Sequence, residues 1–503
     1  MNGREGRGEA AERLLDAALE QVFAGEAVAA RPLAKSPPRR TWLAAAVVLF
    51  ALAITTALMW QARGPGRALA QQPTGPAPLP AQQRAASKAE IDALPADTAN
   101  LCALMTGPEE LEQVTRLHAL RRLQIAPSNL ATAVLRLFGD KGRDEDRKTG
   151  KAATWNDAPA DFLSPLASLP ELEALDLSGD LVSSRNLPAL KACPKLRSLS
   201  LDRGFAVDDA LVTALTELPH LRALRFDIVH LDAAAVTRLR RLALEEIELS
   251  RCPGFDATAF AELCAMKSLR EVSFAWLGRP DFFTGDRKSM LWMPGADDLR
   301  RLEALPALRS LTFARCAIAA EHLAALPTGI TSLALSGTDL APDDFRLLKR
   351  FGKLRHLDLA TAKFSLGISL GAAPDLAAKA DAFAAAVGSL RLTSLDYAGA
   401  LTEDLMLQIA QQPDLTSAHL RTHQLPSLAA LAGAPRLRDL AIVETNGPSH
   451  LTVEDLAPLA RCRALRRFDL RTYDADVTRD ELAKLFGPTV EVTVSTSEIL
   501  PKK

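Results

Sequence analysis

The feature that most constrains the fold of this 503-residue chain is a short apolar repeat. A leucine-like residue, two variable residues, a second apolar residue, one variable residue and a third apolar residue recur in thirteen copies. Uninterrupted copies start 22 to 28 residues apart, a period typical of a solenoid in which each repeat packs against its neighbours. The copies begin at Leu120, Leu172, Leu196, Leu221, Leu244, Leu269, Leu308, Ile330, Leu354, Leu392, Leu415, Leu437 and Leu465.

Each copy predicts a short strand followed by a helical segment. The apolar residues should point inward and the variable residues outward, and segments such as Asp343 to Leu348, which follow Pro or Asp, should form helices on the other side. A single unit cannot bury its leucines, whereas stacked units share one continuous core. We expect VEVTV from Val490 to be a closing strand and the helical region 101–117 to cap the other end.

On these residues the chain resembles the leucine-rich-repeat superfamily from about residue 97 to 503. Copies such as LEALDLSGD from Leu172, with SG after the third apolar residue, are similar to repeats of bacterial leucine-rich proteins. The resemblance implies an α/β fold, a curved solenoid with a parallel sheet on the concave face and helices on the convex face. The concave face of such proteins commonly binds proteins. The inward asparagine of the family is absent from most copies, and Cys252, Cys316 or Thr338 occupies its place, so we expect these to be structural.

An apolar stretch before the repeats predicts one transmembrane helix. Residues 42–60 are nineteen residues without a charge, which span roughly 28 Å as a helix, about the thickness of a bilayer core. Basic residues before the span outnumber those after it, which predicts a cytoplasmic N-terminus and a repeat domain outside the cytoplasm: Arg31, Lys35, Arg39 and Arg40 against Arg63 and Arg67. A cleaved export signal is the alternative, because Arg39-Arg40 resembles a twin-arginine pair and residues 68–70 read ALA.

These signals divide the chain into four parts. Residues 1–40 are a cytoplasmic segment in which 8–25 form a short amphipathic helix, which either docks a cytoplasmic factor or lies near the membrane surface. The transmembrane helix occupies 41–61. Residues 62–96, rich in Pro, Ala and Gln, are a disordered linker, and 97–503 are the repeat domain.

Arginine recurs at the second position of eight copies, which places a row of guanidinium groups along the strands. Such a row suits an acidic peptide, a phosphate or a polysaccharide. Alternatively, each arginine pairs with a nearby acid such as Asp176, Glu248, Asp358 or Asp469 and keeps the strand surface soluble. The row consists of Arg121, Arg197, Arg222, Arg270, Arg309, Arg355, Arg438 and Arg466.

Three insertions, near 138–160, 276–296 and 361–388, interrupt the period and should form loops. The first is almost wholly charged, and the third, rich in alanine, should lengthen a helix. The second concentrates aromatic residues in a chain with 5% aromatics. It either contacts a partner or folds back over the edge of the solenoid. Its candidate contact residues are Trp276, Phe282, Phe283 and Trp292.

Catalytic and metal-binding motifs are absent from the sequence. It lacks HExxH, GxSxG and phosphate-binding loops, and no CxxC pair occurs among its six cysteines. His419 and His423 are four apart but straddle a strand and a loop, so the spacing does not create a metal site. The net charge of −1 does not indicate a nucleic-acid partner.

The sequence therefore predicts a cofactor-free, non-enzymatic protein with two alternative roles. In the first, a membrane-anchored scaffold or receptor facing the cell envelope binds a protein, or a glycan, through its repeats. In the second, it is a transmembrane regulator whose cytoplasmic helix binds a cytoplasmic factor while the repeats sense an external signal. The presence of a partner for residues 1–40 would separate these roles.

Overall fold

The computed structural model describes most of the predicted repeat domain. The described residues are 82–85, 88–105, 108–127, 160–178, 182–202, 205–278, 291–338, 340–360, 375–422, 425–444, 451–472 and 477–496. All of them belong to one compact unit, Gly64–Lys503, which is separate from a unit formed by Met1–Arg63. The amphipathic helix, the transmembrane helix and most of the 138–160 insertion lie outside the described residues. Among the helices of the described ranges, none has the length and apolar character needed to span a bilayer.

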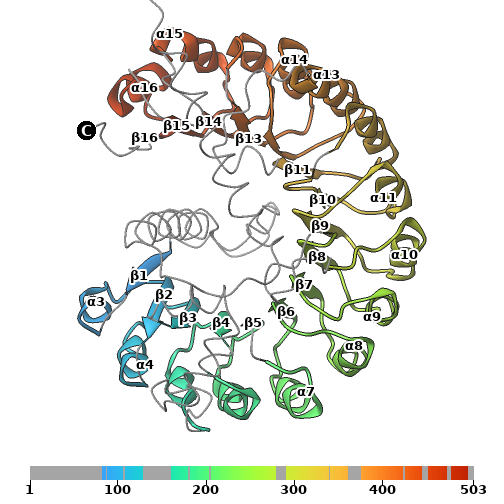
Figure 1. Ribbon diagram of the computed structural model, residues 1–503. Coiled ribbons are helices and arrows are strands. Elements are labelled where there is room, and N and C mark those ends of the chain that lie inside the picture. Colours follow the sequence, from blue (N-terminus) through green and yellow to red (C-terminus); the bar gives the residue numbers. More distant parts are fainter. Residues whose placement is uncertain are drawn as a thin grey trace, which may run out of the picture. The chain divides into compact units, whose positions relative to one another are not determined.

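Sixteen strands in the described ranges form one parallel sheet, and their order in the sheet is their order in the chain (Figure 1). This order requires every strand to pair with its two sequence neighbours, as a solenoid does. The strands are β1 (Gln83–Ala85), β2 (Asn100–Met105), β3 (Arg122–Pro127), β4 (Ala174–Ser178), β5 (Ser198–Asp202), β6 (Ala223–Asp227), β7 (Glu246–Ser250), β8 (Glu271–Ala275), β9 (Ser310–Ala314), β10 (Ser332–Ala334), β11 (His356–Ala360), β12 (Ser394–Ala398), β13 (Ser417–Thr422), β14 (Asp439–Glu444), β15 (Arg467–Thr472) and β16 (Glu491–Thr496).

Helical segments connect the strands and lie on the outer side of the sheet in Figure 1. The α-helices are α3 (Lys88–Ala93), α4 (Pro108–Val114), α7 (Asp209–Thr216), α8 (Ala233–Leu239), α9 (Ala257–Leu263), α10 (Ala296–Arg300), α11 (Ala320–Ala325), α13 (Asp375–Val387), α14 (Glu403–Ala410), α15 (Val453–Leu456) and α16 (Arg479–Phe486). The 3₁₀ helices are η2 (Ser164–Ser168), η3 (Ser184–Ala192), η4 (Arg301–Ala304), η5 (Pro342–Arg350), η6 (Leu428–Gly433) and η7 (Ala457–Arg461). Several begin at an acid or threonine cap: the Asp208 side chain accepts from the Leu211 N–H, and Thr402 accepts from Leu405.

All thirteen copies of the apolar pattern form strands, as predicted. Each strand begins two residues after the first apolar residue, so that residue is position 1 of the repeat and the strand starts at position 3. Positions 1, 4 and 6 point into the core: Leu172, Leu175 and Leu177 are at most 2% exposed. These side chains belong to one continuous apolar cluster that extends from Ala85 to Val492. The closing strand predicted from Val490 is confirmed as β16.

The N-terminal end of the domain differs from the prediction. Residues 100–105 form β2 rather than a capping helix, and β1 and α3 lie in the last part of the predicted disordered linker. The repeat that contains β2 escaped detection because Thr98 occupies position 1. The Thr98 hydroxyl donates to the Pro95 carbonyl at 2.7 Å, which allows a polar side chain to be 4% exposed there.

The register between repeats is fixed by one carbonyl per repeat, at position 2. The Arg121 carbonyl accepts from the N–H groups of Glu173 and Ala174, at 2.8 and 3.0 Å. The Glu173 carbonyl accepts in the same way from the next repeat, at 3.0 and 3.1 Å. Because both bonds must form for a strand to join the ladder, insertions between repeats leave the register unchanged.

The predicted structural role of the buried cysteines is confirmed. The Cys252 thiol donates to the carbonyls of Phe226 and Ser250, and the Cys316 thiol donates to those of Phe274 and Ala314. Burial raises the pKa of the Cys252 thiol to about 12, so it stays neutral. Both side chains act as small core groups.

The third insertion ends in a long helix, as predicted. Helix α13 has 13 residues, more than any other helix that the structure describes, and contains seven alanines. It packs between η5 and α14. The Phe383 ring lies 5.5 Å from that of Phe345 on η5, and it also stacks on the Tyr397 ring of β12, with 4.9 Å between the centroids.

Candidate binding surface on the open face of the sheet

The sheet face opposite the core carries the side chains of positions 3 and 5, and we call this surface the open face. Along each strand, positions 3 and 5 alternate with the buried positions 4 and 6, as the partly exposed and buried residues of β5 and β9 do. Over β3 to β15 positions 3 and 5 hold eight acids, three arginines and two histidines, so the surface is net acidic. The charged members are Arg122, Asp176, Arg225, Glu246, Glu248, Glu271, His356, Asp358, Asp396, His419, Asp439, Arg467 and Asp469.

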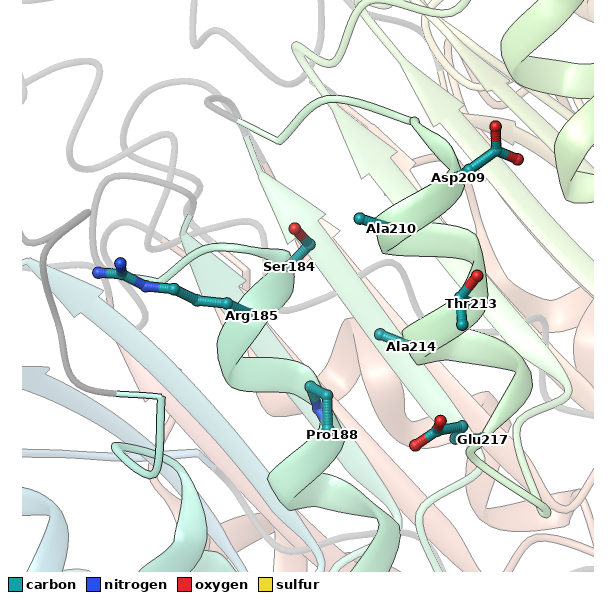
Figure 2. A pocket seen from close by; sticks show the side chains of 8 residues that line it. All are labelled: Ser184, Arg185, Pro188, Asp209, Ala210, Thr213, Ala214 and Glu217. Carbon is teal, nitrogen blue, oxygen red and sulfur yellow. The ribbon is translucent and has the colours of Figure 1, made fainter.

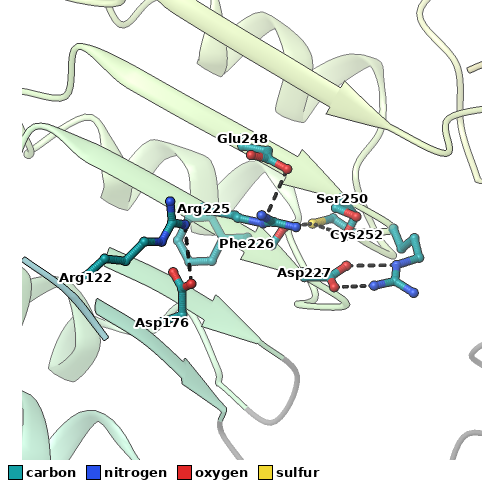
Figure 3. A network of polar contacts seen from close by, with 9 residues as sticks. Arg122, Asp176, Arg225, Phe226, Asp227, Glu248, Ser250 and Cys252 are labelled. Atoms are coloured by element: carbon teal, nitrogen blue, oxygen red, sulfur yellow. Dashed lines mark hydrogen bonds and ion pairs between the residues drawn. The ribbon is translucent and has the colours of Figure 1, made fainter. Parts of the chain in front are cut away.

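The charges on β3 to β7 pair across the strands (Figure 3). Arg122 Nη2 lies 3.4 Å from Asp176 Oδ2, and Arg225 Nε lies 3.3 Å from Glu248 Oε1. Arg225 is directly opposite Glu248, whereas Arg122 is opposite Ala174 and reaches Asp176 diagonally, two residues further along β4. These groups, with Asp227 and Arg251, form what we call the paired network.

Asp227 and Arg251 are the most deeply buried ion pair of this network. Both Arg251 donors reach the Asp227 carboxylate, Nε at 2.8 Å from Oδ1 and Nη2 at Oδ2. The two side chains are 11% and 10% exposed. A bidentate pair at this burial is held in one geometry, which makes the surrounding surface rigid.

The electrostatic effect of the paired network is visible at Glu248. Burial raises the pKa of the Glu248 carboxyl, and the nearby Arg225 guanidinium opposes that rise. The neighbouring Glu246 carboxyl also has a raised pKa, caused by burial and by Glu245. Clustered acids on adjacent strands therefore depend on the arginines between them to remain ionised.

A second group of polar residues lies on β10 to β13. Asp358 and Asp396 are opposite each other in the register of β11 and β12, and Asp396 is opposite His419 on β13. His419 Nδ1 lies 3.1 Å from Asp396 Oδ2, and Arg421 Nη2 lies 3.6 Å from the same oxygen. The carboxylate of Asp396 is thus held from one side only.

Asp358 and His356 both have shifted pKa values. Burial and the adjacent Asp396 raise the pKa of the Asp358 carboxyl, although it accepts hydrogen bonds from the Ser336 hydroxyl at 2.6 Å and the Ala360 N–H at 2.8 Å. Burial and Arg355 lower the pKa of the His356 imidazole, which therefore favours the neutral form at neutral pH. Like charges also act in the paired network, where Asp227 and Asp176 raise the pKa of Glu248, but there each acid has an arginine partner.

The predicted arginine row lies at the edge where the strands begin. Arg121 binds Glu173 Oε1 through Nε at 3.0 Å and Nη2 at 2.7 Å. Glu245 lies between two members of the row, 3.9 Å from Arg222 and 3.2 Å from Arg270. Three further members donate to the backbone carbonyl of the residue at position 1 of their own repeat, over 2.9 to 3.1 Å. These bonds run from Arg309 to Leu308, from Arg355 to Leu354 and from Arg466 to Leu465. Arg197 and Arg438 are exposed members of the same row.

The acids predicted to pair with this row are bound elsewhere. Asp176 binds Arg122, Glu248 binds Arg225 and Asp469 binds Arg471, while Asp358 accepts from Ser336. The reason is geometric. Position 5 points along the open face, whereas position 2 precedes the strand, and the acids that reach the row are themselves at position 2, as Glu173 and Glu245 are.

Trp276 lies at the opposite edge, where the strands end. It is one of four non-glycine residues with positive φ at the same repeat position, Ile228, Arg251, Trp276 and Arg315, with φ between 53° and 69°. Each N–H donates to the carbonyl at position 7 of the next repeat, as Trp276 does to Ala314 at 2.9 Å. The Arg315 guanidinium stacks 4.9 Å from the centre of the Trp276 ring. The left-handed backbone thus places large side chains side by side along this edge.

Trp292 covers the core instead of forming a free contact surface. Its ring lies 5.9 Å from both Phe255 and Phe260, and it packs against the continuous core. A hydrogen bond joins the two described ends of the insertion, where the Gly278 N–H donates to the Leu291 carbonyl at 2.9 Å. For Trp292 the alternative in which the insertion folds back is therefore confirmed. Phe282 and Phe283 lie outside the described residues.

The hollows of the described surface lie away from the open face. One, of about 430 Å³, lies between η3 and α7 and is lined by Ser184, Arg185, Asp209 and Glu217 (Figure 2). Another, of about 610 Å³, lies among loops near Arg309 and Lys353. Both are open and shallow. No set of three or more metal-ligating side chains occurs together in the described part of the chain.

The group on β10 to β13 was not predicted as a site. His419 was considered only with His423, and Asp358 only as a pair for an arginine. The signal that could have found it is the succession of position 5 along the repeats, which holds Asp358, Asp396 and His419 in three consecutive copies. Comparing one position across neighbouring strands detects such a cluster, whereas comparing residues along one strand does not.

Comparison with known proteins adds little to this picture. No protein-family model and no curated protein matches the sequence. The solved TLR13–ssRNA13 complex is 16% identical over 77% of this chain and 63% of the TLR13 chain, with a TM-score of 0.29. The internalin inlF of Listeria monocytogenes is 13% identical over 78% of this chain and 90% of its own, also with a TM-score of 0.29.

This chain therefore spans less than two thirds of the TLR13 chain. Because these likenesses are low, the class of the fold rests on the repeat geometry of this chain itself. Thirteen copies of one apolar pattern place consecutive strands in one parallel sheet over a shared core. That geometry is a leucine-rich-repeat solenoid.

Proposed function

We propose that this chain is a non-catalytic, membrane-anchored binding protein whose repeat domain faces the cell envelope and recognises a protein through the open face. The single observation that carries this proposal is the ordered array of charges on that face. Strand register fixes each charge relative to the next, at a spacing of about 4.8 Å between strands. A rigid, extended charge pattern suits a macromolecular surface, because a partner can match many charges at once.

The shape and charge of the surface support a protein partner over other classes. The two hollows described above lie off the open face. The eight acids and three arginines at positions 3 and 5 would repel a phosphate backbone. Neutral and anionic glycans lack the positive charges that this pattern would match. We therefore favour a protein with basic groups over a nucleic acid or a glycan.

The membrane anchor in this proposal rests on the uncharged stretch 42–60 and on the basic residues before it. A reporter that is active only in the cytoplasm, fused to the C-terminus, should give no signal in intact cells. The same reporter inserted after Met1 should be active. Strong activity of the C-terminal fusion would reverse the topology.

The binding surface can be mapped with a photoreactive amino acid introduced singly in the full chain. We expect adducts with a protein from Ser273 and Thr312 on the open face, but not from Thr213 on the helical side. Single-stranded RNA is tested in parallel as a competitor. Adducts that form only from Thr213 would contradict the proposal. So would a competition experiment in which single-stranded RNA abolishes the adducts from Ser273 and Thr312.

A role as transmembrane regulator is tested separately at the cytoplasmic segment. Leu15→Asp and Leu19→Asp in the full chain would disrupt the apolar face predicted for residues 8–25. If the protein is a scaffold, both variants should keep the open-face adducts and lose no downstream response. Loss of a cytoplasmic response with intact adducts would favour the regulator.

A further inference from the structure

Three buried polar atoms on three adjacent strands find no hydrogen-bond acceptor or donor among the residues that the structure describes. They are Ser332 Oγ on β10, His356 Nδ1 on β11 and Asp396 Oδ1 on β12. Ser332 is 7% exposed. Buried polar groups in folded proteins are nearly always satisfied, so three such atoms together require an explanation.

Strand register places the residues that carry these atoms on the open face of three consecutive strands, Ser332 and His356 at position 3 and Asp396 at position 5. Ser332 is directly opposite His356, and Asp358 is directly opposite Asp396. With neighbouring strands about 4.8 Å apart, the three strands span about 10 Å. We call Ser332, His356, Asp358 and Asp396 the acceptor cluster.

All of these groups can accept a hydrogen bond. A serine hydroxyl has two lone pairs, a neutral imidazole has one acceptor nitrogen, and a carboxylate accepts at both oxygens. The second oxygen of Asp396 is already held by His419 and Arg421. The three unpartnered atoms can therefore accept from an added donor, and the two adjacent carboxylates favour a donor that carries a positive charge.

We propose that the acceptor cluster receives the ammonium group of a lysine side chain from the protein that binds the open face. An ammonium group is a compact cation with three donors, which suits a surface where unpartnered acceptors are present on three adjacent strands. The side chains of Asp396 and His419 are 24% and 20% exposed, which leaves access for a slim methylene stem. This inference rests on the proposed function and adds the chemistry of the partner.

Other occupants fit the acceptor cluster less well. A planar guanidinium directs its donors in one plane and suits a single bidentate carboxylate, whereas the unpartnered acceptors here belong to three different residues. A metal ion is disfavoured because the described side chains provide no cluster of three or more ligands for it. Both become outcomes of the test below.

The direct test titrates the full chain, solubilised in detergent and labelled with ¹³C at histidine Cε1, with butylammonium chloride. Butanol is the neutral control of the same length, sodium chloride controls for ionic strength, and butylguanidinium and zinc chloride test the other occupants. We expect saturable shifts of the His356 and His419 resonances with butylammonium alone. Shifts with butylguanidinium or zinc only, or equal shifts with butanol, would overturn the lysine assignment.

Substitutions then locate the binding. Asp396→Asn should weaken butylammonium binding at least about tenfold, because it removes a charge-assisted acceptor. Asp176→Asn is the matched control, the same change at the same repeat position where Arg122 already neutralises the carboxylate; it should change affinity less than about twofold. Ser332→Ala, which removes one hydroxyl, covers the case in which Asp396→Asn unfolds. Equal affinities for all three variants would refute the inference.

Failure of this inference can be told apart from failure of the proposed function. If open-face adducts from Ser273 and Thr312 persist in Asp396→Asn while butylammonium does not bind the unmodified chain, only the lysine assignment is wrong. If adducts appear only from Thr213, the open face is not the binding surface and the proposed function fails first.

Discussion

The paired network on β3 to β7 and the acceptor cluster on β10 to β12 occupy the same face of the same sheet but differ in how their charges are balanced. In the paired network each acid contacts an arginine that lies on a neighbouring strand or just after the end of that strand, as Asp227 contacts Arg251. Even there, Arg122 Nε finds no acceptor in the described ranges. In the acceptor cluster, two acids are neighbours and only Asp396 contacts cations, on one side.

This difference separates charges that have a partner from charges that lack one. Removing one member of a buried ion pair leaves the other uncompensated and is strongly destabilising, although the intact pair itself adds little to stability. A buried acid beside another acid is unfavourable as it stands, and such groups are often found where a protein binds something. The following variants test the comparison, from the largest expected effect to the smallest.

The largest effect should come from the core that both regions share. Leu249→Asp, beneath the paired network, and Leu357→Asp, beneath the acceptor cluster, should each lower the free energy of unfolding by at least about 4 kcal/mol, because each places a charge at a site no more than 1% exposed. Urea denaturation followed by circular dichroism measures this. Thr312→Asp on the open face, which is opposite the uncharged Ser273 and Ala334, is the control and should unfold nearly as the unmodified chain does. Tolerance of either core variant would disprove the register described above.

Breaking the paired network should cost almost as much. Asp227→Ala leaves the Arg251 guanidinium without its bidentate acceptor at 11% exposure, and we expect a loss of about 3 kcal/mol. The double variant Asp227→Leu with Arg251→Met should recover most of that loss in the same denaturation experiment. A double variant as unstable as the single one would show that the pair is needed for more than charge balance.

A smaller loss is expected at the insertion between the two regions. Trp292→Ala removes a ring that packs on Phe255 and Phe260, and it should lower stability by about 2 to 3 kcal/mol because the side chain is only partly buried. The control is Trp276→Ala at the strand-end edge, where the ring contacts Arg315; it should cost less. Thermal unfolding of both variants gives the order, and a reversed order would mean that the insertion does not cover the core.

The smallest effect, and the only gain, is expected in the acceptor cluster. A raised pKa means that folded Asp358 holds a proton that the unfolded chain has released, so stability falls as pH rises from the ordinary aspartate pKa through the raised value. Asp358→Asn removes this fall and should gain up to about 1 kcal/mol at neutral pH. Its oxygen can accept from Ala360 and its amide can donate to the Ser336 hydroxyl.

The measurement is the unfolding free energy across the acidic pH range for Asp358→Asn and the unmodified chain. The two curves should converge below the ordinary aspartate pKa and separate above it. Asp176→Asn, in the paired network, should give no gain. If Asp358→Asn is less stable than the unmodified chain at neutral pH, the carboxylate stabilises the fold as a hydrogen-bond acceptor. Its charge is then not the unbalanced charge proposed here.

The sequence predicted the strands because their information is local and periodic. Positions 1, 4 and 6 must be apolar in every copy, so thirteen strands and the closing strand could be found from spacing alone. The β2 repeat was missed because one hydrogen bond from Thr98 to Pro95 substitutes for an apolar residue. Composition cannot reveal such a bond, because it depends on a backbone carbonyl whose position is set by the fold.

The candidate site was less predictable because it depends on contacts between repeats. Arginine at position 2 was visible, but its acids are at position 2 of neighbouring repeats, as Glu245 is for Arg222 and Arg270. Trp292 was visible as an aromatic residue on an insertion, yet whether it meets Phe260 or solvent depends on how the insertion returns to the repeats. Both contacts can be predicted only when the order of the strands in the sheet is known.

That strand order also determines how the domain would respond to a pulling force. Every strand is bonded only to the strands before and after it in the chain, and position 2 carbonyls such as that of Arg466 accept the first bond of the next strand. A force applied at the C-terminal end therefore loads the hydrogen bonds between β15 and β16 first on that side, and then those of the preceding pair. We expect the domain to lengthen in steps of one repeat, each of which absorbs mechanical work.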